Sequence, residues 1–113
     1  MSWSVDARVG VRLGGAGSVR AGDAVLVEGV GEVGGEAVER FAAEGGHVAG
    51  CACCVTHSEA AAALDRLFQR RARGQIPFFR RVLAVTATPK GDMAVFAALR
   101  NDPLVSSRFR LED

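Results

Sequence analysis

The sequence predicts an α/β fold, in which a mainly parallel sheet with flanking helices forms a single domain over residues 1–113. Residues 24–27 form a short, continuous apolar run, and residues 81–86, which are apolar at positions 82–85, predict a second strand buried on both faces. Helical patterns follow both runs, and alternation of strands with helices is typical of layered α/β domains. A chain of 113 residues has room for one hydrophobic core and not for two.

The N-terminal part of the chain predicts a strand followed by a glycine turn. Apolar residues alternate with charged residues or glycine over residues 5–13, which indicates a half-exposed strand at a sheet edge. Gly14-Gly15-Ala16-Gly17-Ser18 follows as a plain turn that joins two strands, as in a hairpin. After the apolar run at residues 24–27, glycines punctuate a loop that contains Glu28 and Glu32.

Three helices are expected farther along the chain. Residues 36–43 predict a short helix, and residues 47–49 a weak strand after it. Thr56-His57-Ser58-Glu59 has the spacing of a capping box, and its helix runs to about Arg73 before Gly74. Asp92 is expected to cap the third helix, which ends near Pro103. Residues expected to face the core are Ala37, Val38, Phe41, Leu64, Leu67, Phe68, Met93, Phe96 and Leu99.

Composition excludes several classes of protein. Hydrophobic residues make up 49% and charged residues 24%, which indicates a globular chain and not a disordered one. The formal net charge of +1 gives no basis for binding nucleic acid or an anionic membrane, and we expect neither as a partner. The arginines of residues 70–81 are interpreted as a solvated helix end, where cations are favoured. Without a signal-peptide pattern or a membrane-length apolar run, we expect a cytoplasmic location.

The strongest chemical signal is the motif Cys51-Ala52-Cys53-Cys54, which contains all three cysteines. In a reducing cytoplasm these thiols are expected to bind a soft metal ion as thiolates and not to form disulfides. In an extended turn Cys51 and Cys53 point to the same side, and Cys54 lies near a helix start that lowers thiol pKa. The alternative, that the three are small buried hydrophobic residues, does not account for three in four positions.

A tetrahedral zinc site needs a fourth ligand beside the three sulfurs. The donors in the same half of the chain are Glu32, His47 and His57. Each histidine is as readily interpreted as an ordinary polar residue, one at a strand edge and one in a first helical turn. The composition and spacing of the chain alone leave the fourth ligand open.

Several segments resemble, in order, the CobW family of metal-handling GTPases. The cysteine motif with Gly50 matches the family's G-C-x-C-C, and the weaker matches are residues 25–34, 65–67, 76–82, 99–104 and 108–111. The resemblance covers residues 23–113 and leaves residues 1–22 as a divergent strand and glycine turn. It implies part of a P-loop GTPase-like domain, with Cys51, Cys53 and Cys54 as metal ligands. It also implies Glu32 as a further ligand, because Glu32 falls on the second acidic position of the family's switch segment.

The departures from the family pattern bear on nucleotide binding. The Walker A phosphate loop, G-x-x-x-x-G-K-[ST], is missing or degenerate, since no lysine lies between Gly17 and Ser18. Val85-Thr86-Ala87-Thr88 replaces the family's E-T-T-G, and the guanine-reading N-K-x-D region is lacking. We therefore expect no catalytic residues, no GTP or magnesium cofactor and no independent GTP hydrolysis.

Together these features predict a protein that binds zinc or another soft divalent metal. Its expected role is metal homeostasis or delivery to a client metalloprotein. One alternative is a GTP-binding metallochaperone whose nucleotide site is atypical or completed by another protein chain. A second is a decayed fragment without activity.

Overall fold

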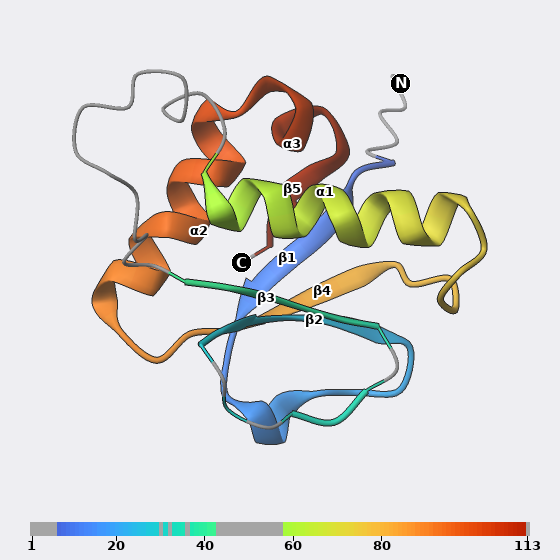
Figure 1. Ribbon diagram of the computed structural model, residues 1–113, viewed down its shortest axis with the longest axis horizontal. Helices are drawn as coiled ribbons and strands as arrows, with labels where there is room; N and C mark the ends of the chain where they lie inside the picture. The colour runs from blue at the N-terminus through green and yellow to red at the C-terminus, as the bar shows by residue number, and fades with distance from the viewer. Residues whose placement is uncertain (1–6, 30, 32, 36, 43–57, 113) are drawn as a thin grey trace, which may run out of the picture.

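The computed structural model describes residues 7–29, 31, 33–35, 37–42 and 58–112. These residues form an α/β fold whose five-stranded sheet is entirely parallel, in the order β3-β2-β4-β1-β5 (Figure 1). The strands are β1 (Val9–Leu13), β2 (Asp23–Glu28), β3 (Val38–Phe41), β4 (Arg81–Val85) and β5 (Phe109–Leu111). The expected α/β class and the parallel sheet are thereby confirmed.

The two predicted apolar runs are the paired central strands β2 and β4. Their register extends from Asp23 opposite Arg81 to Val27 opposite Val85. Leu26 and Leu83 are fully buried although they point to opposite faces of the sheet. Burial on both faces explains why these strands are continuously apolar and do not alternate.

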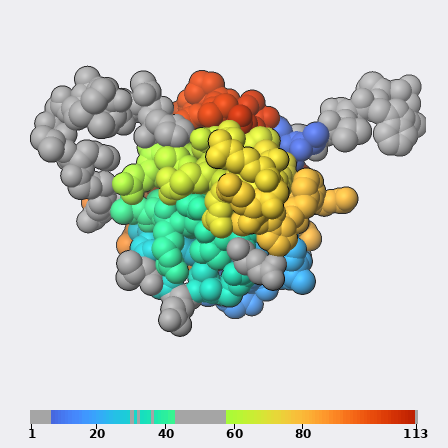
Figure 2. Space-filling model, turned by 45° about the vertical axis from the view of Figure 1, so that its right-hand side comes forward, coloured from blue at the N-terminus to red at the C-terminus, as the bar shows by residue number. Residues whose placement is uncertain are grey.

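Three helices, α1 (Glu59–Ala72), α2 (Pro89–Asn101) and α3 (Pro103–Arg108), lie on the same face of the sheet in the described part of the chain (Figure 1). Figure 2 shows α1 packed over the strands at the β3 side. One hydrophobic core joins this face to the helices; among its members are Val11, Ala24, Leu26, Leu64, Leu67, Val82, Val95, Val105 and Phe109. None of the described helices has the length and apolar character needed to cross a membrane.

On the opposite face, within the described residues, lie two short connections: residues 14–22, and residues 29, 31, 33–35 and 37. Within their described residues they contain no α-helix, only the 3-10 turn η1 (Ala16–Ser18). Both connections step toward the β3 edge, whereas the helical connections step toward β5. Crossover connections between parallel strands are right-handed, so two connections that run in opposite directions along the sheet lie on opposite faces. Both helical connections run toward β5, and their helices therefore lie on one face. We call the other side the helix-free face.

Strand β1 is not an edge strand, and the predicted hairpin is wrong. β1 lies between β4 and β5, and β2 is separated from it by β4. Its charged position Arg12 points to the helix-free face, where it donates to Ser18 O at 2.8 Å and lies 3.5 Å from Asp23. Alternation therefore indicates a strand with one face under the helices and one polar face. It does not distinguish an edge strand from a central one.

The helix expected at residues 36–43 is also wrong, because residues Val38–Phe41 form β3. The strand pairs with β2, Phe41 is buried in the core, and Glu39 accepts from Arg66 at 2.6 Å and from Arg70 at 2.7 Å. Apolar residues three apart suit a helix, but pairing with the edge of β2 overrides that local pattern. The strand expected at residues 47–49 lies outside the described residues.

The second predicted helix is confirmed as α1, which buries Leu64 and Leu67 and is followed by Gly74 at φ +70°. Its described N-cap is Ser58, whose side chain accepts from Ala61 N at 3.1 Å. Thr56, expected to cap this helix, lies outside the described residues.

The third predicted helix is confirmed as α2, but its start and its inner face differ from the expectation. Thr88 is the N-cap, and Asp92 lies within the first turn. Met93 is 69% exposed, while the buried stripe is Val95, Ala98 and Leu99. The contacts of α2 with α1 and α3, and not the spacing of apolar residues alone, select which face is buried.

Candidate functional site

The carboxyl ends of the strands form the edge where open parallel α/β sheets usually hold their ligands. At this edge β2 ends in Glu28, and the segment after β4 leads into α2. Oε1 of Glu28 accepts from Ala87 N at 2.7 Å and from Thr88 N at 3.0 Å. Oε2 accepts from the hydroxyl of Thr88 at 2.6 Å. A strand-end carboxylate is thus bound to the start of a helix about sixty residues later.

The local sequence at the start of α2 makes this contact geometrically accessible. Thr88 is extended and its hydroxyl accepts from Gly91 N at 3.0 Å, while Pro89 occupies the first helical position. A β-carbon on Gly91 would overlap the carboxylate of Glu28. Glycine at this position therefore leaves the space that Glu28 occupies.

Hydrogen bonding changes the acidity of Glu28. Desolvation, the largest single effect, raises its pKa, but the bonds from the Thr88 hydroxyl, Ala87 N and Thr88 N together outweigh it and lower the pKa below its ordinary value. The carboxylate is therefore ionised at neutral pH with both oxygens engaged. It is poorly suited to act as a general base, and its charge occupies the helix terminus where an anion would otherwise be favoured.

A second carboxylate, Asp92, lies in the first turn of α2 and accepts a hydrogen bond from Thr86 Oγ1 through Oδ1. Within the described residues, no group of three or more His, Cys, Asp or Glu side chains is placed to hold a metal ion. The described carboxyl edge thus organises the start of α2, and its two acids are already engaged with threonine hydroxyls.

The predicted metal ligands Cys51, Cys53, Cys54 and Glu32 lie outside the described residues, as do His47 and His57. The structure describes the residues on either side of the cysteine segment. Ala42, which follows β3, donates its N–H to Glu59 Oε2 at 3.0 Å, and Glu59 is the first residue of α1.

The described start of α1 differs from the predicted capping position. Ser58 has an extended backbone, with φ −70° and ψ 164°, so the helix begins at Glu59 and not at Thr56. Cys54 lies outside the described residues, so the expected lowering of its thiol pKa stays a prediction.

The glycine segment after β1 also differs from the expected hairpin turn. Ala16–Ser18 form η1, Val19 is extended, and the chain then returns to begin β2 at Asp23. All of residues 14–22 are described, and they contain no α-helix.

Sequence reasoning placed Glu28 only in a loop and missed its contact with Thr88. No local signal reveals such a pair, because the two residues are brought together by the pairing of β2 with β4. Comparison of the chain with family models, with curated proteins and with solved structures finds no match.

Proposed function

We propose that this chain is a CobW-like metal-binding protein that holds zinc or another soft divalent ion through Cys51, Cys53 and Cys54. Glu32 is the candidate fourth ligand, by its place in the resemblance. The role that follows is metal buffering or delivery to a client metalloprotein, without independent GTP hydrolysis. The observation that carries the proposal is the concentration of three thiols within four positions.

The fixed ends of the cysteine segment support this proposal. Residues 43–57 leave from the end of β3 and return at the start of α1, and the hydrogen bond from Ala42 to Glu59 joins these two points. A chain segment whose two ends are held together has fewer accessible conformations than one with free ends. Gathering its side chains around one ion then costs less entropy than in an open chain.

The connection after β1 supports the absence of independent GTP hydrolysis. Phosphate loops bind through backbone N–H groups that lead directly into a helix N-terminus. Here residues 14–22 pass from β1 to β2 through η1 alone. The N-terminus of α2, which lies at the same sheet edge, is already occupied by the carboxylate of Glu28.

Metal titration of the reduced protein tests the proposal. We expect one zinc ion per chain, a rise in the unfolding temperature on binding, and thiolate-to-metal charge-transfer absorption when cobalt replaces zinc. Cys53→Ser leaves two thiolates, so we expect it to weaken the charge-transfer band and to remove most of the affinity. Stoichiometric binding that survives this variant, or no binding by the reduced chain, would overturn the proposal.

The fourth ligand is tested by a matched pair of variants. Glu32→Gln is expected to weaken zinc binding about tenfold or more, and Glu44→Gln removes the same charge elsewhere without that loss. Equal affinities in the two variants would remove Glu32 from the ligand set and leave the three thiolates.

Nucleotide binding is tested in parallel with the same protein. GTP with magnesium is expected to leave the unfolding temperature unchanged, whereas ligand binding to the native state would raise it. A nucleotide-dependent rise would favour the alternative of a GTP-binding metallochaperone with an atypical site.

A further inference from the structure

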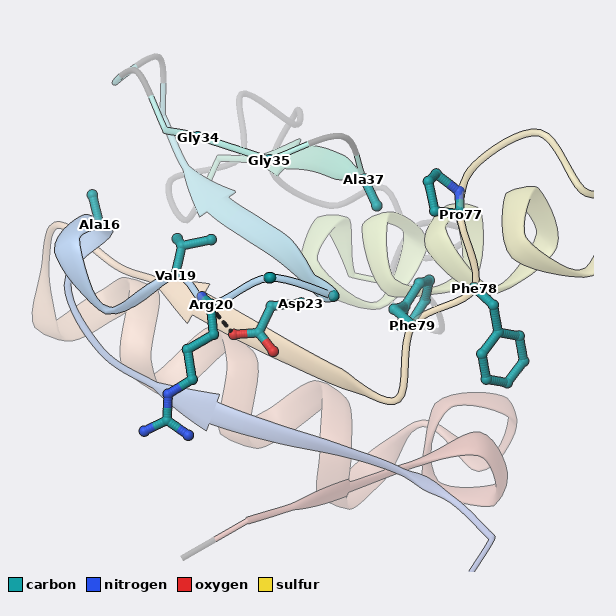
Figure 3. Close-up of a pocket in the computed structure, with 12 residues that line it drawn as sticks. Ala16, Val19, Arg20, Asp23, Gly34, Gly35, Ala37, Pro77, Phe78 and Phe79 are labelled. Atoms are coloured by element: carbon teal, nitrogen blue, oxygen red, sulfur yellow. Dashed lines mark hydrogen bonds between the residues drawn. The ribbon is translucent and has the colours of Figure 1, made fainter.

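The two edges of the sheet differ in how far they are closed to another chain. β3 is the edge strand on one side, and β5 is the edge strand on the other, where it pairs with β1. In Figure 3 β5 is the pale red segment beside β1. The outer backbone groups of an edge strand can pair with a strand of another molecule unless the fold covers them.

The outer side of β3 is covered by arginines of α1. The carbonyl oxygen of Val38 accepts from Arg70 Nη1 at 3.2 Å, and that of Arg40 accepts from Arg66 Nη2 at 3.2 Å. Both oxygens belong to the alternate residues of β3 whose peptide groups point away from β2. Another strand would have to displace these side chains before it could pair with β3.

The outer side of β5 carries backbone groups without such a cover. Glu112 N donates to Val11 O at 2.7 Å and therefore faces β1. Because peptide groups alternate in direction along a strand, those of Arg110 also face β1, and those of Phe109 and Leu111 face outward. The N–H of Phe109 donates to the last turn of α3. Within the described residues, the C=O of Phe109 and both peptide groups of Leu111 have no hydrogen-bond partner.

On the helix side, an apolar surface continues from β5 onto α2. Leu111 is 44% exposed, and together with Phe96 and Leu99 it lines a hollow of about 350 Å³. Met93 precedes Phe96 by three positions, so it lies on the same face of α2, and it is 69% exposed. A second chain that pairs with β5 would cover apolar surface as well as backbone.

On the helix-free face, β5 and the residue after it carry one charge of each sign. Val9 and Val11 face the helix-side core, so Gly10 between them faces the other side. Arg110 is opposite Gly10 in the register, and the side chain of Glu112 lies where a β-carbon on Gly10 would overlap it. Glu112 forms no ion pair with another described residue. Arg110 is already engaged, but a guanidinium has five N–H donors and can serve a further acceptor.

These two charges select one register for pairing between two copies of β5. Edge strands related by a two-fold axis pair antiparallel, and each contact occurs twice. With Leu111 opposite Leu111, the two leucines exchange N–H···O bonds, and Arg110 lies directly opposite Glu112 of the second copy. A shift of two residues in either direction would instead place Arg110 opposite Arg110, or Glu112 opposite Glu112, and like charges directly opposite are destabilising. Charge complementarity thus identifies a second copy as the occupant of this edge.

We propose that two copies of the chain pair through β5, antiparallel about a two-fold axis at Leu111, and join their sheets into one. The interface consists of the backbone bonds between the leucines, two pairs of Arg110 with Glu112, and apolar surface of α2. Because the strand is short, the dimer is weak, with a dissociation constant on the order of 0.1 mM. The interface contains none of the proposed metal ligands, so it goes beyond the proposed metal-binding function.

Sedimentation velocity measures the association on reduced protein in the presence of EDTA, which excludes dimers formed through disulfides or zinc. We expect the chain to shift from monomer to dimer between about 10 μM and about 1 mM. A chain that stays monomeric at the upper concentration would overturn the proposal. Dimerisation that requires zinc or an oxidant would overturn it as well, and would point to the cysteines instead.

A charge exchange tests the register. Arg110→Glu and Glu112→Arg should each weaken the dimer about tenfold, because each places two pairs of like charges opposite one another. The double variant should return to within about twofold of the wild-type affinity. Arg73→Glu, an equal charge change at the exposed end of α1, should leave the affinity unchanged. Losses that merely add in the double variant would contradict the pairing of Arg110 with Glu112.

Leu111→Pro tests the backbone pairing. Proline lacks the N–H that should bond to the second copy, whereas the bonds between β5 and β1 use other residues. This variant should stay monomeric, while Leu111→Ala, which keeps the N–H, should still dimerise, and the two should unfold at similar temperatures. Dimerisation that survives proline would refute the proposal. If proline unfolds the chain, the charge exchange decides alone.

Discussion

Replacing Glu28 with glutamine tests how strongly the end of β2 stabilises the start of α2. Glutamine keeps the shape of the side chain and one carbonyl oxygen, which can still accept from Ala87 N and Thr88 N. Its amide group faces the hydroxyl of Thr88, which must turn to accept instead of donate. The substitution therefore removes the charge and leaves most of the geometry intact.

The expected loss follows from the three bonds that the carboxylate accepts. A hydrogen bond to a charged group contributes about 1.5–3 kcal/mol against about 1 kcal/mol for a neutral pair, and a negative charge at a helix N-terminus adds about 0.3–1 kcal/mol. Because Glu28 is partly exposed, solvent screening reduces these contributions. We expect Glu28→Gln to lower the free energy of unfolding by about 1 kcal/mol at pH 7, or the unfolding temperature by about 4 °C.

The pH dependence of this loss has a defined sign. The pKa of Glu28 in the folded chain lies below its ordinary value, so the unfolded chain binds the proton more readily. The stabilisation is then complete above the ordinary pKa of a glutamate, about 4.3, and disappears as the pH falls through the lower, folded value. The difference between wild type and Glu28→Gln should therefore be constant near neutrality and should shrink in acid.

Urea unfolding at several pH values measures both quantities. Glu59→Gln is the matched control, because Glu59 also lies in a first helical turn but accepts one hydrogen bond from an exposed N–H. Its loss at pH 7 should be below about 0.5 kcal/mol. Equal stability of wild type and Glu28→Gln at pH 7, or a difference that does not shrink in acid, would refute the role assigned to Glu28.

Further substitutions probe contacts that depend on the fold. Gly91→Ala should lower the free energy of unfolding by about 1 kcal/mol or more, although alanine favours helices, because its β-carbon would overlap the carboxylate of Glu28. In a Glu28→Ala background this loss should vanish, because the carboxylate is no longer there. Arg71→Ala should lower the free energy of unfolding by about 2 kcal/mol in urea, because it removes the stacking on the Phe78 ring and the hydrogen bond to Phe79 O. Arg73→Ala, two positions along at an exposed site, should change it by almost nothing, and similar losses in the two variants would contradict the contact. Asp102→Ala should cost about 1–2 kcal/mol, because its carboxylate caps two N–H groups of α3, and Asp102→Asn should recover most of this; no recovery would argue against capping.

The elements that the sequence predicts well are those whose burial is nearly complete or whose ends carry strong local signals. β2 and β4 are apolar at consecutive positions because both of their faces are covered, and few other structures produce that pattern. α1 has a buried stripe of Leu64 and Leu67 and ends beside Gly74, whose positive φ disfavours other residues. The C-terminal α3 and β5 carried no such pattern and were not predicted as elements.

The incorrect predictions share a physical cause, which is that short segments take their structure from their neighbours. β3 has only four residues, and hydrogen bonds to β2 outweigh its weak helical spacing. β1 alternates as an edge strand would, yet β4 and β5 enclose it. The N-cap of α2 is Thr88 and not the predicted Asp92. Glu28, at the end of β2, accepts a hydrogen bond from the Thr88 hydroxyl and so stabilises this cap.

For the candidate sites, sequence and tertiary structure supplied different parts. Cys51, Cys53 and Cys54 were found from the sequence, because neighbouring thiols are a local chemical signal that requires no fold to recognise. The contact of Glu28 with Thr88 needed the tertiary structure. It joins residues far apart in the chain, and only the strand order, which places β2 beside β4, brings them together.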